Sequence, residues 1–121
     1  MLKTIMVVDD SSSIREAVGF TLQNEGYNVL KAEHGKDALR YFGTGPIDLV
    51  ITDLHMPEMN GIELTAEIRK LPDYSRIPIL VLTTESQTEK KLEAKKAGAT
   101  GWLVKPFLPD TLLSIIKKVM R

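Results

Sequence analysis

The stretch "VVDDSSS", residues 7–13, joins three signals: an apolar run, two carboxylates and three serines. The apolar run is typical of a buried strand, and it ends at Asp9 and Asp10. One of the serines can cap a following helix, and Ser13 with Glu16 fits a capping box. The stretch therefore predicts a strand, an acidic turn and a helix.

The same alternation of strand and helix continues along the chain. Five apolar runs of strand length are predicted: Ile5–Val8, Val29–Ala32, Leu49–Thr52, Ile79–Thr83 and Trp102–Val104. Helical spacing of apolar residues follows each run: Ile14 to Leu22, Ala38 to Phe42, Ile62 to Leu71, Glu85–Ala97 and Leu112 to Val119. Gly26 and Gly98 are placed to end the first and fourth helices. The pattern predicts a doubly wound α/β sandwich with a five-stranded parallel sheet of order 2-1-3-4-5.

Length and composition bound the class of protein. The chain has 121 residues and no cysteine, and it has no apolar run long enough for a signal peptide or a membrane span. We therefore expect one domain over residues 1–121 without an output domain, in the cytoplasm and away from membranes. The 16 acids balance the 16 bases, which argues against nucleic-acid binding. Residues 1–60 contain nine acids and five bases, and residues 61–121 contain seven acids and eleven bases. This uneven distribution indicates either an ordinary solvated surface or an acidic centre and a basic face on opposite parts of the fold.

Three carboxylates follow two neighbouring strands of the predicted sheet. Asp9 and Asp10 come after the first strand, and Asp53 comes after the third. In the predicted order these strands are adjacent at the switch point, so the carboxylates are expected to share one crevice. Crowded carboxylates with no His or Cys ligand favour Mg²⁺, with Mn²⁺ as a substitute.

Two further groups are expected at the same edge of the sheet. Thr83 ends the fourth strand and Lys105 follows the fifth. A hydroxyl and an ammonium beside carboxylates and a divalent cation suit a phosphoryl group. Asp53 is the predicted nucleophile, because aspartate can form an acyl phosphate.

These motifs resemble the receiver domain of bacterial response regulators. The matching stretches are "VVDDSSSIR", "ITDLHMPEMNGIEL", "LTTE" and "AGATGWLVKPF", in this order, and they span nearly the whole chain. Among receivers the chain is most similar to the single-domain chemotaxis type, which implies a flavodoxin-like, CheY-like fold.

The resemblance implies a role for each site residue. Asp53 would be phosphorylated by a sensor histidine kinase. Asp10, Asp53 and the backbone carbonyl of His55 would bind Mg²⁺ directly, and Asp9 would hold a metal-bound water. Lys105 would pair with the phosphate, and its bond to Pro106 would be cis. Such a protein is no enzyme in the usual sense, because it catalyses only its own phosphorylation and dephosphorylation.

The resemblance also implies a switch between Thr83 and an aromatic residue. The aromatic is usually Tyr or Phe, whereas this chain has Trp102, which could also be a partly buried packing residue. His55 and Glu85 lie two residues after Asp53 and Thr83, where receivers tune dephosphorylation; the alternative is exposed loop side chains.

The chain is expected to be a monomer that transmits its signal by binding a protein partner. The fourth helix has lysines and a thin apolar face, so a tilt of this helix with the fifth strand and fifth helix is the expected response. The target is expected to be a flagellar motor switch protein; the alternative is a relay that passes phosphate to a histidine phosphotransfer protein. A Mg²⁺-dependent phosphohydrolase with an Asp nucleophile is a distant alternative, because the first strand ends in adjacent "DD" and not in D-x-D.

Overall fold

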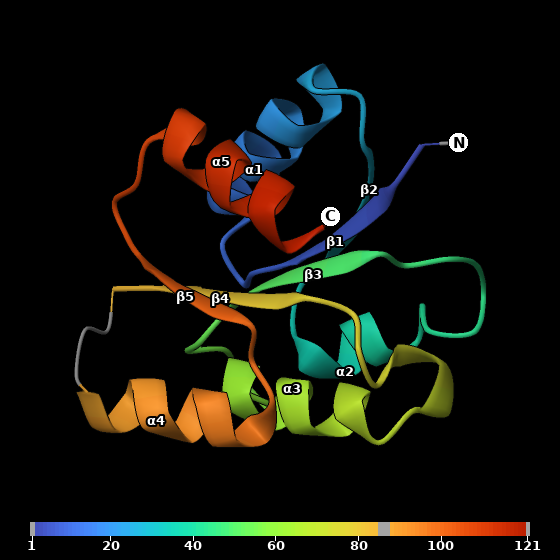
Figure 1. Ribbon diagram of the computed structural model, residues 1–121, viewed down its shortest axis with the longest axis vertical. Coiled ribbons are helices and arrows are strands. Elements are labelled where there is room, and N and C mark those ends of the chain that lie inside the picture. Colours follow the sequence, from blue (N-terminus) through green and yellow to red (C-terminus); the bar gives the residue numbers. More distant parts are fainter. Residues whose placement is uncertain (1, 85–87, 121) are drawn as a thin grey trace.

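The computed structural model describes residues 2–84 and 88–120. Its centre is a parallel sheet of five strands in the order β2-β1-β3-β4-β5, which confirms the predicted order (Figure 1). The strands are β1 (Thr4–Val8), β2 (Asn28–Ala32), β3 (Leu49–Asp53), β4 (Ile79–Thr83) and β5 (Gly101–Val104). Each lies within one residue of the predicted bounds, because continuous apolar runs are what a sheet covered on both faces requires.

Helices cover both faces of this sheet. They are α1 (Ser12–Asn24), α2 (Gly35–Leu39), α3 (Gly61–Arg69), α4 (Thr88–Ala97) and α5 (Pro109–Val119), with a short 3₁₀ helix at Pro72–Tyr74. Figure 1 shows α1 and α5 on one face and α2, α3 and α4 on the other. The predicted doubly wound sandwich is thereby confirmed.

Two main apolar layers hold the sandwich together, one on each face of the sheet. Ile5 and Val7 of β1 pack with α1 and α5 through Leu22 and Ile116. The alternate residue Met6 packs on the opposite face with Leu64 and other residues of the second layer. Side chains alternate across a strand, so the central strands are buried on both faces and leave only their ends to carry polar groups.

The start of α1 differs from the prediction in detail. Ser11 is the N-cap, and its hydroxyl accepts a hydrogen bond from the Ile14 amide. The predicted capping box of Ser13 with Glu16 is wrong, because the helix already begins at Ser12 and Ser13 lies inside its first turn. A capping box does occur at α3, where Asn60 and Glu63 exchange side-chain and backbone hydrogen bonds.

Helix α4 is held mainly at its C-terminal end. Ala94 is the one buried side chain within Thr88–Ala97, which confirms the predicted thin apolar face. Gly98 follows with φ +109°, and its carbonyl accepts hydrogen bonds of 3.0 and 2.8 Å from the Arg69 guanidinium. The predicted start of this helix at Glu85 lies outside the described residues.

Candidate phosphoryl-acceptor site

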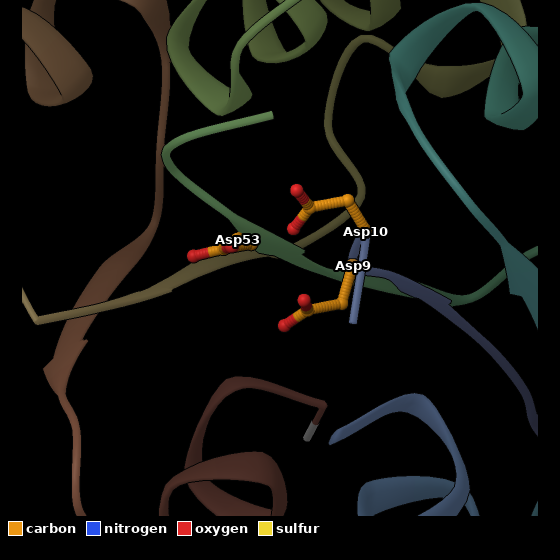
Figure 2. Close-up of side chains that lie close together, drawn as sticks. All are labelled: Asp9, Asp10 and Asp53. Atoms are coloured by element: carbon orange, nitrogen blue, oxygen red, sulfur yellow. The ribbon is translucent and has the colours of Figure 1, made fainter. Parts of the chain in front are cut away.

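Strand register places the key carboxylates side by side. In the pairing of β1 with β3, Val8 lies opposite Thr52, so Asp9 and Asp53 are the next residues of neighbouring strands. Asp10 follows Asp9 at the same edge of the sheet. Ligand oxygens of these three aspartates all lie within 4.8 Å of one another. Figure 2 shows the three carboxylates at the ends of their strands, extending to the same side.

Lys105 reaches this carboxylate cluster from β5. Its Nζ lies 3.1 Å from Asp9 Oδ2 and 3.4 Å from Asp53 Oδ1. All three side chains are largely buried, with exposed fractions of 13% for Lys105, 4% for Asp9 and 13% for Asp53. One ammonium is therefore shared by two buried carboxylates, and Asp10, which is exposed, adds a third negative charge.

Backbone groups orient the two inner carboxylates. Asp9 Oδ1 accepts a hydrogen bond of 2.9 Å from the Ser11 amide, and Asp53 Oδ1 accepts one of 2.9 Å from the Leu54 amide. The Arg15 guanidinium donates to the Asp9 carbonyl at 2.6 Å. The two amide bonds orient the carboxylates and the Arg15 bond holds the Asp9 backbone, so the site is preorganised.

The electrostatics of Asp53 reflect this crowding. Burial raises the pKa of the Asp53 carboxyl above its ordinary value, and the Asp9 carboxylate adds to the rise. Lys105 and the Leu54 amide oppose the rise without cancelling it. A site in which carboxylates outnumber nearby cations suits a further positive charge.

The donor set fits a hard divalent cation. All of the clustered ligand atoms are carboxylate oxygens, and Mg²⁺ is typically held by one or two carboxylates with water completing its shell. This chemistry agrees with the magnesium site expected from the sequence.

Thr83 lies on the strand next to Asp53. Asp53 pairs with Leu82 across β3 and β4, so Thr83 extends one residue further at the same edge, and its side chain is buried. The Thr83 carbonyl accepts a 2.7 Å hydrogen bond from the Lys105 amide, which joins the ends of β4 and β5. The Lys105–Pro106 bond is cis, as the resemblance implied.

Trp102 lies on β5, away from the carboxylate cluster. It is partly buried and packs against a small apolar group that includes Leu54, Val81 and Ala94. In this structure Trp102 therefore has the position of a packing residue. Its indole Nε1 is buried and has no hydrogen-bond partner among the described residues. Leu54 directly follows Asp53, so this packing links the tryptophan to the strand that ends at Asp53.

Of the two residues expected to tune dephosphorylation, His55 and Glu85, the structure describes only His55. His55 follows β3 in the loop before α3, and it is exposed. Glu85 lies outside the described residues.

Sequence reasoning missed two contributors to the site. The Leu54 amide carries no side-chain signal, and no pattern could have shown it. Arg15 offered a weak signal, since it is the first base after the acidic turn and lies in the first turns of the following helix.

No helix in the described part of the chain is both long enough and apolar enough to span a membrane.

Comparison with known proteins places this site in a family. The model of the response regulator receiver domain matches residues 5–117. The chain is 39% identical over 118 residues to the chemotaxis protein CheY1 of Helicobacter pylori, which covers 96% of this chain and 95% of that protein. The solved structure of CheY4 of Vibrio cholerae is 46% identical with a TM-score of 0.95, over 98% of this chain and 99% of that chain.

A structure with a bound ligand is also similar. The response regulator TrrA of Thermotoga maritima, solved in complex with Mg²⁺–BeF, is 41% identical with a TM-score of 0.86, over 98% of this chain and 99% of that chain. The carboxylate cluster, the strand order and these similarities agree. The chain belongs to the response regulator receiver domain family, and within it to the chemotaxis response regulators of two-component signalling.

Proposed function

We propose that Asp53 accepts a phosphoryl group from the phosphohistidine of a sensor histidine kinase. The observation that supports this most directly is the meeting of three carboxylates within 4.8 Å beside the Lys105 ammonium. The position of Asp53 at the end of a central strand makes it the carboxylate flanked by all the other groups.

The chain's own residues divide the work of this transfer. Asp53 Oδ1 is bonded by the Leu54 amide and lies 3.4 Å from Lys105, so Oδ2 is the oxygen that attacks phosphorus. The P–O bond forms as the P–N bond of phosphohistidine breaks, and the electron pair returns to the imidazole. Lys105 then exchanges its contact with Asp53 for one with a phosphoryl oxygen, and Thr83 donates its hydroxyl to another.

A divalent cation completes the proposed site. Asp10, Asp53 and the His55 carbonyl would hold Mg²⁺ directly, with Mn²⁺ as a substitute, and Asp9 would hold it through water. When bound, the cation supplies positive charge to the transferring phosphoryl oxygens. The chain would act only on its own aspartate, and His55 and Glu85 would set how long the acyl phosphate lasts.

Phosphorylation is proposed to act through Thr83 and Trp102 on the face formed by α4, β5 and α5. The new charge would lie beside Thr83, which ends β4, the strand that precedes α4. Helix α4 has one buried side chain, Ala94, and is therefore inexpensive to shift. We expect the activated face to bind a downstream protein such as a flagellar motor switch protein. Binding of a histidine phosphotransfer protein instead would indicate a relay.

The test is phosphorylation by acetyl phosphate with Mg²⁺, followed by intact-mass spectrometry. The unaltered chain should gain one phosphoryl group, and chelation of Mg²⁺ should abolish the gain. Asp53→Asn should abolish it as well, whereas Asp73→Asn, an exposed aspartate on the 3₁₀ helix, should leave it unchanged. Phosphorylation that persists in Asp53→Asn would contradict the proposed acceptor.

A further inference from the structure

The loop between β3 and α3 carries the His55 carbonyl, which the proposed function assigns to the metal. The loop is closed at its base, where the Gly61 amide donates a 2.8 Å hydrogen bond to the Leu54 carbonyl. Glu58 in this loop has φ +67°, a left-handed conformation that is unfavourable for a non-glycine residue. Such a conformation persists only where surrounding contacts hold it.

The turn that begins α2 supplies a close contact to this loop. Gly35 is buried, and a Cβ atom added to it would lie 2.8 Å from Met59 Cγ and Sδ and 2.9 Å from Met59 Cβ. Met59 itself is partly buried against the apolar layer that contains Met6 and Leu64. The side chain of Met59 therefore fills the space directly above the Gly35 backbone, and a residue with a Cβ atom there would force Met59 or the turn to shift.

A polar contact beside Gly35 reaches the strained residue of the loop. His34 Nδ1 accepts the Asp37 amide at 3.2 Å and so caps α2, which leaves Nε2 to carry the proton. Nε2 lies 3.4 Å from Glu58 Oε2, and Lys36 Nζ lies 3.8 Å from Glu58 Oε1. Met59 and Glu58, which are adjacent, are thus both contacted by the turn at residues 34–36.

We propose that His34 and Gly35 are positioning residues that hold the β3–α3 loop, and with it the His55 carbonyl, in the geometry that binds Mg²⁺. The inference rests on the proposed metal site and adds to it a second layer of contacts. Neither residue belongs to the carboxylate cluster, so their effect on the metal is expected to pass through Glu58 and Met59.

The test measures the Mg²⁺ dissociation constant of the unphosphorylated chain by calorimetry. Gly35→Ala should weaken Mg²⁺ binding about tenfold, as changes in the groups behind metal ligands commonly do. His34→Asn keeps a good N-cap but is too short to reach Glu58, so it should weaken binding about two- to threefold. Gly45→Ala is the matched control, because nothing lies within 4 Å of its added Cβ, and it should leave the dissociation constant unchanged.

A second readout separates positioning from a general loss of stability. The rise in melting temperature caused by saturating Mg²⁺ reports binding to the folded state. In Gly35→Ala this rise should shrink at a given Mg²⁺ concentration. An equal loss of melting temperature with and without Mg²⁺, at an unchanged dissociation constant, would overturn the inference.

The remaining outcomes also decide between the two proposals. If Gly35→Ala does not fold, His34→Asn carries the test, and an unchanged dissociation constant in that variant overturns the inference. If the unaltered chain fails to bind Mg²⁺, the proposed metal site fails and the inference fails with it. Normal binding in the unaltered chain with normal binding in both variants overturns the inference alone.

Discussion

Replacing Lys105 with Met should destabilise the folded chain strongly, because it removes the cation shared by two buried carboxylates. Nζ lies 3.1 Å from Asp9 Oδ2 and 3.4 Å from Asp53 Oδ1. At an effective dielectric constant of about 20, each attraction is about 5 kcal/mol before desolvation is counted. Removing one partner from a buried pair typically costs about 3–5 kcal/mol. The site opens to water at Asp10, so we expect a loss of about 3 kcal/mol in the free energy of unfolding, at the low end of that range.

Lys31→Met is the matched control for this change. Lys31 Nζ lies 3.0 Å from Glu16 Oε2, but the two side chains are 31% and 69% exposed. An exposed pair of this kind contributes about 0.5 kcal/mol. The substitution is the same and the distances are similar, so the difference between the two losses measures the combined effect of burial and of the second carboxylate that Lys105 contacts.

The assay is urea unfolding at pH 7, first in a chelator and then in Mg²⁺. Lys105→Met should recover part of its lost free energy of unfolding in Mg²⁺, because the cation replaces the missing positive charge. The increase in its free energy of unfolding on adding Mg²⁺ should exceed the increase in the unaltered chain. Equal losses in Lys105→Met and Lys31→Met would refute the argument that burial makes the Lys105 contacts strong. No recovery in Mg²⁺ would refute the assignment of a cation to these carboxylates.

Three further predictions concern pH, backbone conformation and the tryptophan. The raised pKa of Asp53 means that the folded state holds this proton more tightly, so stability should fall as pH rises from the ordinary aspartate range through the raised value. In Mg²⁺-free buffer, Asp53→Asn should flatten that fall in melting temperature. Gly98→Ala should lower the free energy of unfolding by about 3 kcal/mol, since φ is +109° and the new Cβ meets Arg69 Cγ at 2.8 Å. Gly26→Ala, with φ +94° and open space around it, should cost about 1 kcal/mol by urea unfolding; equal costs would contradict a rigid Arg69 contact. Beryllofluoride with Mg²⁺ should change Trp102 fluorescence in the unaltered chain but not in Asp53→Asn, and an unchanged spectrum with proven binding would count against Trp102 as part of the switch.

Most of the fold could be predicted because it depends on local pattern. The five apolar runs are long enough and continuous enough to be buried strands, and the helical spacing between them leaves few possible topologies. The exact cap of α1 could not be predicted in this way. Ser11, Ser12 and Ser13 have the same side chain, and only the path of the chain from β1 into the helix selects Ser11.

The site, like the fold, could be predicted only in part. The sequence predicts that the strand ends carry Asp9, Asp10, Asp53 and Lys105, because the carboxyl ends of parallel strands lie at one edge of the sheet. The roles of the Leu54 amide and of Arg15 could not be predicted from the sequence. The first has no side-chain signature, and the second depends on how α1 leaves the sheet.

The amino-acid sequence is sufficient to assign the chemical groups of the site to the ends of particular strands. Which of these groups touch one another depends on the folded structure. Lys105 and Asp9 are separated by 96 positions, and the Arg69 contact with the Gly98 carbonyl spans 29. Contacts of this range depend on strand register and helix packing to within an ångström, and hydrogen bonds and ion pairs lose their strength over such distances. Gly35 shows the same limit, because a glycine in a turn signals flexibility, whereas the Met59 side chain packed above it is visible only in the folded chain.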